Sequence, residues 1–162
     1  MRSHWTRHDE RGPDHRRRQR PEELLDRQAV VDVCVRYAAA LDRRDWDLFR
    51  TCFTPDAGGD YAGIGVLNGY EALERVCRHV LEPLAASQHL LGNFEVTVAA
   101  DEARATCYFQ AQHVKPGTAG GDNYIVAGTY TDRHVRTPDG WRIAHRRFEV
   151  TWTDGNRAVL VV

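Results

Sequence analysis

The stretch FEVTVAADEARATCYFQAQHV (residues 94–114) contains two runs in which apolar and polar residues alternate. Such alternation is typical of β-strands that bury one face, because successive side chains point to opposite sides of a sheet. Asp101 and Glu102 separate the two runs and predict a turn between them. One face of the second run is expected to consist of Ala103, Ala105, Cys107, Phe109, Ala111 and His113.

The segment that follows predicts two further strands. Residues 115–122 read KPGTAGGD, a composition typical of a loop, and residues 124–135 form the next strand-like run. The sequence Thr-Pro-Asp-Gly at 137–140 favours a tight hairpin turn, after which residues 141–152 form the last run. The apolar parity changes along this last run, which predicts a β-bulge or a sharp bend.

The N-terminal half predicts three helices. Pro21 suits a first helical turn, and Asp45 is a favourable N-cap for a second helix. A third helix is expected over residues 70–84, whereas the Gly- and Asp-rich residues 56–69 predict a loop with a short strand near 64–67. The apolar stripe of the first helix comprises Val30, Cys34, Tyr37 and Leu41. Three helices followed by consecutive antiparallel strands predict an α+β fold.

The length of 162 residues fits one domain. We expect residues 1–20 to form a disordered Arg-rich tail, residues 21–157 the domain, and residues 158–162 a C-terminal tail. The formal net charge of −1 argues against nucleic-acid binding, and no apolar run approaches the roughly 20 residues of a membrane helix. The four cysteines lack metal-ligand spacing and predict buried free thiols in a reducing cytoplasm.

Three segments carry a resemblance to a known family. They are RYAAALDRRDWDLFRTCFTPDA (36–57), SQHLLGN (87–93) and GTYTDRHVRTPDGWRIAHRR (128–147). They resemble SnoaL-like proteins of the nuclear transport factor 2-like superfamily, in its scytalone dehydratase, bile-acid dehydratase and polyketide cyclase branch. The resemblance implies a cone-shaped α+β barrel, in which three N-terminal helices pack on a curved antiparallel sheet.

The same resemblance implies an acid–base site. In the dehydratase branch a histidine pairs with an aspartate on the first helix, and His89 and Asp42 match this pair. A tyrosine five residues before the aspartate corresponds to Tyr37, and a second pocket histidine corresponds to His113. We predict that His89 is a general base, that Asp42 fixes its tautomer, and that Tyr37 stabilises developing negative charge.

These residues also have purely structural interpretations. Tyr37 could serve core packing, Asp42 could be an ordinary carboxylate at a helix end, and His113 could be a satisfied core histidine. The rest of the predicted pocket suits a hydrophobic, ring-containing ligand and comprises Tyr61, Tyr130, Phe53, Phe109 and Trp152. No metal site and no cofactor are expected.

The leading functional hypothesis is a cofactor-independent dehydratase, cyclase or isomerase that abstracts a proton from a hydrophobic small molecule. The alternative is a non-catalytic small-molecule-binding or dimerisation domain, such as a protein similar to the β subunit of ring-hydroxylating dioxygenases. We expect no nucleic-acid or membrane partner. We expect a homo-oligomer, either a trimer or a dimer, with Trp141 and Ile143 at the interface.

Overall fold

The computed structural model describes residues 20–160 of the chain. Its elements in chain order are α1 (Pro21–Arg43), α2 (Trp46–Arg50), β1 (Phe53–Tyr61), β2 (Gly65–Asn68), α3 (Tyr70–Leu81), β3 (Ala86–Ala99), β4 (Glu102–Val114), β5 (Asn123–Thr137), β6 (Gly140–Gly155) and the 3₁₀ turn η1 (Arg157–Leu160). Residues 1–19 of the expected N-terminal tail, and residues 161–162, lie outside the described part. Residues 158–160, expected to be tail, belong instead to η1, where Val159 is buried.

One six-stranded sheet, in the order β2-β1-β6-β5-β4-β3, forms the larger layer of the fold. The long strands β3 to β6 are antiparallel neighbours, as the alternating sequence pattern predicts. β1 pairs with β6 in parallel, so the sheet is mixed rather than wholly antiparallel. The expected parity change is present, because the β5–β6 register shifts between Ala127 and Gly128 and again between Arg133 and His134.

The prediction of a loop over residues 56–69 was wrong for β1. Gly58 and Gly59 lie within this strand, where neighbouring side chains crowd the position of a Cβ atom. A Cβ atom at Gly59 would lie 2.7 Å from the ring of Tyr61, and one at Gly58 would lie 3.3 Å from the ring of His145. Close approach therefore selects glycine here and hides the strand's alternating pattern.

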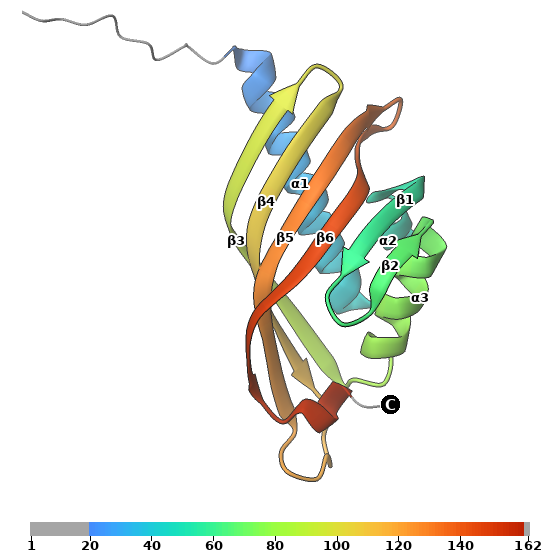
Figure 1. Cartoon of the computed structure of the whole chain (residues 1–162), viewed down its shortest axis with the longest axis vertical. Coiled ribbons are helices and arrows are strands. Elements are labelled where there is room, and N and C mark those ends of the chain that lie inside the picture. Colours follow the sequence, from blue (N-terminus) through green and yellow to red (C-terminus); the bar gives the residue numbers. More distant parts are fainter. Residues whose placement is uncertain (1–19, 161–162) are drawn as a thin grey trace, which may run out of the picture.

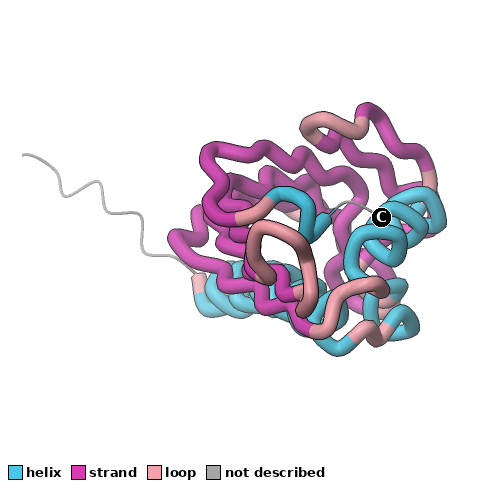
Figure 2. The backbone as a smooth tube through the Cα atoms, turned by 90° about the horizontal axis from the view of Figure 1, so that it is seen from below, coloured by secondary structure: helices cyan, strands magenta, loops and turns pink. Residues whose placement is uncertain are grey.

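The helices cover the inner face of the curved sheet (Figures 1 and 2). α1 crosses the long strands, and all four residues of its predicted stripe are buried. The Asp45 side chain caps α2 by accepting a hydrogen bond from the Leu48 N–H at 2.9 Å. α3 ends at Leu81, three residues earlier than expected, and packs on β1. Among residues 20–160, no helix combines the length and apolar character needed to cross a membrane.

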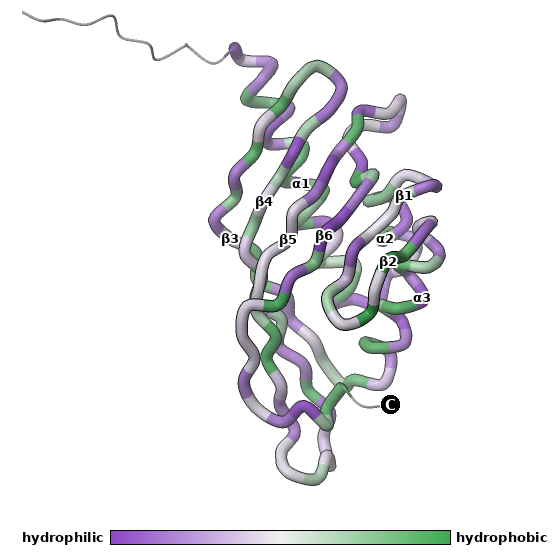
Figure 3. Tube along the Cα trace, in the orientation of Figure 1, coloured by the Kyte–Doolittle hydropathy of each residue, from purple (hydrophilic) through white to green (hydrophobic). Residues whose placement is uncertain are grey.

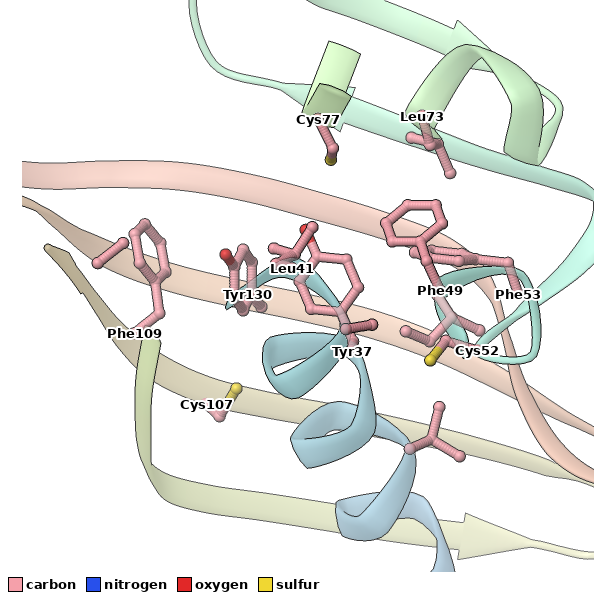
Figure 4. Close-up of a cluster of buried hydrophobic side chains, with 14 of the residues drawn as sticks. Tyr37, Leu41, Phe49, Cys52, Phe53, Leu73, Cys77, Cys107, Phe109 and Tyr130 are labelled. Carbon is pink, nitrogen blue, oxygen red and sulfur yellow. The ribbon is translucent and has the colours of Figure 1, made fainter. Parts of the chain in front are cut away.

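An aromatic and aliphatic core fills the space between α1, α2, α3 and the sheet (Figure 4). Hydropathy alternates along the long strands because only alternate side chains reach this core (Figure 3). Trp141 and Ile143, predicted to form an interface, are instead buried within the domain, so that prediction was wrong. The change of parity along β6 turns them toward the core. All four cysteines are buried and free, as predicted.

Candidate active site

A cavity of about 610 Å³ lies between α3 and the inner face of the sheet. One wall is aromatic and is centred on Phe148. The rings of Tyr61 and Phe109 stack on Phe148 and the ring of Tyr130 is tilted against it, at centroid distances of 5.1 to 5.9 Å. The facing wall is aliphatic and is supplied mainly by Val76, Val80 and Leu81. An apolar cavity with a few polar groups is the usual form of a small-molecule site.

His89 and Asp42 meet at the edge of this cavity, although 47 positions separate them in the chain. The His89 Nδ1 atom lies 2.6 Å from Oδ1 of Asp42, and the His89 backbone N–H donates to Oδ2 at 2.9 Å. A carboxylate accepts but does not donate, so Nδ1 carries the proton and Nε2 has a free lone pair. The His89 side chain is 5% exposed and lines the cavity. The arrangement therefore presents a basic nitrogen in apolar surroundings.

The end of α1 positions the Asp42 carboxylate. Arg44 adopts a left-handed conformation with φ of 56°, and its guanidinium donates to the carbonyl oxygens of Asp42 and Leu81. The same guanidinium donates to Ser87 Oγ at 2.7 Å, and Ser87 Oγ donates to Asp42 Oδ1 at 3.2 Å. Burial opposes ionisation of Asp42, but the hydrogen bonds from His89 and Ser87 outweigh it and lower the pKa of Asp42. Asp42 is therefore a fixed anion behind His89.

His113 lies on β4 with its ring centroid 6.1 Å from that of His89. Its Nδ1–H donates to the Tyr124 carbonyl oxygen at 3.2 Å, which leaves Nε2 as an acceptor. Burial, with the nearby His89 as a second cause, lowers the pKa of His113 to about 4. At neutral pH His113 is therefore uncharged and accepts hydrogen bonds but holds no second proton to donate.

Tyrosine hydroxyl groups lie deeper in the cavity. Tyr37, Tyr61 and Tyr130 all line it and are buried. Burial raises the pKa of each phenol well above its ordinary value, so all three remain neutral donors. The Tyr61 hydroxyl has no hydrogen-bond partner among the described residues. A buried hydroxyl without a partner is costly, and a bound substrate oxygen would satisfy it.

Beneath the tyrosines lies a buried ion pair that sequence reasoning missed. Arg146 donates to both carboxylate oxygens of Asp132, at 2.8 and 2.5 Å, and both residues are at most 1% exposed. The guanidinium lies between the rings of Tyr37 and Tyr130, at 4.0 and 4.1 Å from their centroids. It therefore fixes the floor of the cavity by cation–π contact. Arg146 sits six residues after the Gly140 turn, in a run of Arg and His that gave no signal for burial.

Two predicted pocket residues lie outside the cavity. Phe53 is buried in the core against Tyr37 and Phe49. Trp152 is 48% exposed, because the register shift at Ala127 and Gly128 turns it to the outer face of the sheet. One group of potential metal ligands, Cys34 with Asp132 and His134, converges within residues 20–160, and it lies outside the cavity.

A family model described as the SnoaL-like domain matches residues 22–147. The chain belongs to this SnoaL-like family. The family and the α+β fold expected from the sequence are thereby confirmed. This SnoaL-like domain is 37% identical over 130 residues to the uncharacterized protein Rv2910c of Mycobacterium tuberculosis, covering 76% of this chain and 84% of that protein.

Two further similarities extend the comparison. The SnoaL-like domain is 32% identical over 142 residues to the terrestric acid biosynthesis cluster protein E of Penicillium crustosum, covering 84% of this chain and 90% of that protein. It superposes on a hexachlorocyclohexane dehydrochlorinase (LinA) type 2 with a TM-score of 0.73 and 19% identity, covering 86% of this chain and 94% of that one. The second likeness shows a shared fold.

Proposed function

We propose that this protein is a cofactor-independent enzyme of the dehydratase, cyclase or isomerase type, and that His89 is its general base. The observation that supports the proposal best is the 2.6 Å contact between His89 Nδ1 and Asp42, on a side chain that lines an apolar cavity. If the His89–Asp42 pair had no access to the cavity, a structural role would have been favoured instead. Similarity to a biosynthetic cluster protein points in the same direction.

In the proposed reaction, His89 Nε2 removes a proton from carbon adjacent to a carbonyl group. Asp42 stabilises the resulting imidazolium, and the Tyr37 phenol donates a hydrogen bond to the developing oxyanion. In a dehydration the imidazolium then delivers its proton to a departing β-hydroxyl, so that water leaves and a double bond forms. In an isomerisation the proton returns to another carbon. Neutral His113 accepts a hydrogen bond from a substrate hydroxyl and orients it.

The cavity lining narrows the class of substrate. The aromatic rings on one wall and the aliphatic side chains on the other suit a hydrophobic ring compound. Among the described residues 20–160, no aspartate or glutamate lines the cavity, and the exposed Arg157 of η1 is the lining residue with a fixed positive charge. We therefore expect neutral or anionic ring compounds to bind, and cationic ones to be excluded.

Deuterium exchange tests the proposal without knowledge of the natural substrate. The protein is incubated in D₂O with a panel of cyclic ketones and β-hydroxy ketones, and exchange and water loss are followed by NMR. We expect exchange in the wild type and in Gln88→Ala, which alters the exposed neighbour of His89. His89→Ala should lose it. Compounds that bind without any exchange would instead support the non-catalytic binding domain.

We also propose a homo-oligomer, through a surface different from the one first predicted. Leu90 on β3, Tyr108 on β4 and Trp152 on β6 are about half exposed and line one groove on the outer sheet face. Large exposed apolar groups of this kind are typical of interfaces. Sedimentation should show a dimer or trimer that Trp152→Glu weakens, and a monodisperse wild-type monomer would contradict this proposal.

A further inference from the structure

One guanidinium joins the three elements that surround the His89–Asp42 pair, and the proposed reaction does not use it. Arg44 directly follows α1, and its Nη1 donates to the Asp42 carbonyl oxygen at 3.0 Å. Its Nε donates to the carbonyl oxygen of Leu81, the last residue of α3, at 3.1 Å. Nη1 also donates to Ser87 Oγ on β3 at 2.7 Å, the shortest of these contacts. Both members of the pair and the α3 wall of the cavity are therefore tied to one side chain.

The backbone of Arg44 adopts a conformation that is unfavourable for an arginine. Its φ of 56° lies in the left-handed region, and the position after a helix with this conformation is usually glycine or asparagine. Glycine would end α1 at a lower cost, so helix termination alone does not account for an arginine here. Backbone strain of this kind is typical of functional sites. The bonds made by the guanidinium supply a reason for the side chain.

Arg44 fixes the direction in which the Ser87 hydroxyl points. A serine hydroxyl has one hydrogen to donate and lone pairs that accept, whereas a guanidinium only donates. Ser87 Oγ is therefore the acceptor in its 2.7 Å contact with Arg44. Its own hydrogen remains available for Asp42 Oδ1, which lies 3.2 Å away. The hydroxyl thus connects the cation of Arg44 to the carboxylate of Asp42.

The bond from Ser87 completes the set of donors around the Asp42 carboxylate. Oδ1 accepts from Ser87 and from His89 Nδ1, while Oδ2 accepts from the His89 backbone N–H. With donors at both oxygens, the carboxylate cannot rotate without losing a hydrogen bond. In this orientation it holds the imidazole with Nδ1 protonated and Nε2 free to act as a base.

We propose that Arg44 is a positioning residue for the His89–Asp42 pair, and that it acts through Ser87. The guanidinium orients the Ser87 hydroxyl, the hydroxyl orients the carboxylate, and the carboxylate orients the imidazole. The consequence for turnover rests on the proposed function, because the orientation of His89 affects a rate only if His89 reacts. Misplacement of a reacting group by about 1 Å can lower a rate roughly 100-fold.

Two pairs of variants separate this role from ordinary structural support. Ser87→Ala removes the hydroxyl and Ser87→Thr keeps it. Arg44→Met removes the anchoring guanidinium, and the matched Arg136→Met removes one that joins α1 to the β3–β4 turn through Asp26 and Asp101. Ser87→Ala and Arg44→Met should lower the maximal rate of deuterium exchange roughly 10- to 100-fold and change the half-saturating concentration by less than about threefold. Ser87→Thr and Arg136→Met should exchange as the wild type does.

The imidazole itself provides a readout that needs no substrate. In protein labelled with ¹⁵N-histidine, the Nδ1 proton of His89 should give a sharp NMR signal, because its hydrogen bond to Asp42 slows exchange with water. The absence of this signal from His89→Ala assigns it. We expect the signal to broaden or disappear in Ser87→Ala and Arg44→Met, and to persist in Ser87→Thr and Arg136→Met.

The two readouts fail in different ways. A sharp His89 signal in folded Ser87→Ala and Arg44→Met would overturn the positioning role, whatever the exchange rates. A full exchange rate in Ser87→Ala would overturn it as well. If the signals follow the expected pattern but the wild type exchanges no compound, the positioning of the pair is supported and the proposed enzymatic function is contradicted.

Discussion

Two hydrogen-bonded carboxylate pairs lie in this domain, and they differ mainly in access. Asp42 holds the imidazole of His89, which lines the cavity, and Asp42 itself is 24% exposed. Asp132 holds the guanidinium of Arg146, and both are sealed at 1% exposure or less. The first pair contains an imidazole, which can act as a base, whereas the second contains a permanent cation.

This contrast teaches what separates a reactive pair from a structural one in the same domain. A reactive pair needs a titratable member and an opening through which a substrate reaches it. The Asp132–Arg146 pair has no such opening, but its guanidinium supports the rings of Tyr37 and Tyr130, which line the cavity. We therefore expect removal of the first pair to affect rate and removal of the second to affect stability.

The largest effect is expected for His89→Ala. Loss of a positioned general base should reduce deuterium exchange by about 100- to 10,000-fold. The free energy of unfolding should change by about 1 kcal/mol or less, since Asp42 remains partly exposed and keeps its bond from Ser87. Exchange kinetics and urea denaturation measure the two quantities. Undiminished exchange in this variant would remove the base assignment.

The opposite pattern is expected for Asp132→Ala. It leaves the Arg146 cation buried without its partner, which should cost about 3–5 kcal/mol of unfolding free energy. The double variant Asp132→Leu with Arg146→Met should recover much of that loss, because it removes both charges. Urea denaturation with matched Asp42→Asn measures the contrast. If Asp42→Asn proved as destabilising as Asp132→Ala, the two pairs would not differ as described.

Much of the fold was predictable from short-range patterns, and the reactive pair was predictable only through the family resemblance. The apolar stripe of α1 repeats over several helical turns, and the alternation of buried and exposed residues continues along β4. Both patterns are long enough to distinguish a helical period from a strand period. β1 was missed because Gly58 and Gly59 replace its alternating side chains. Trp141, Ile143 and Trp152 were placed on the wrong faces, since the exact position of a register shift has no local signal.

The buried clusters could not be predicted for a different reason. Asp132 and His134 are two residues apart on one strand, but Cys34 and Arg146 reach them only through the tertiary fold. Aspartate and arginine are mostly exposed residue types, so sequence reasoning normally places them on the surface. These residues differ from surface residues of the same types only in being buried, and their burial depends on how α1 crosses the sheet.

A pH series should reveal the contribution of the buried His113 to stability. The folded-state pKa of His113 is lowered to about 4 from its ordinary 6.5, so between these values the unfolded chain binds a proton that the folded chain does not. Stability should therefore fall as the pH drops from 6.5 toward 4, by on the order of 3 kcal/mol in total. In the His113→Gln variant, the free energy of unfolding should fall less steeply with decreasing pH. Urea denaturation at pH 7, 5.5 and 4.5 measures this dependence. An unchanged slope would show that His113 is protonated in the folded state.

The smallest effect on stability, and the sharpest test of the cavity as a binding site, comes from Tyr61→Phe. In the wild type the buried Tyr61 hydroxyl has no partner among residues 20–160, so its removal should leave stability unchanged or raise it by up to about 1 kcal/mol. Tyr61 lines the cavity, where a bound substrate oxygen would supply the missing partner, and exchange should therefore weaken although the protein becomes no less stable. If Tyr61 only packs the core, Tyr61→Phe should leave both stability and exchange unchanged, because Phe conserves the ring and its stacking contact with Phe148. Melting temperature and exchange rate are measured on the same preparation, and full exchange in this variant would show that the hydroxyl has no role in binding.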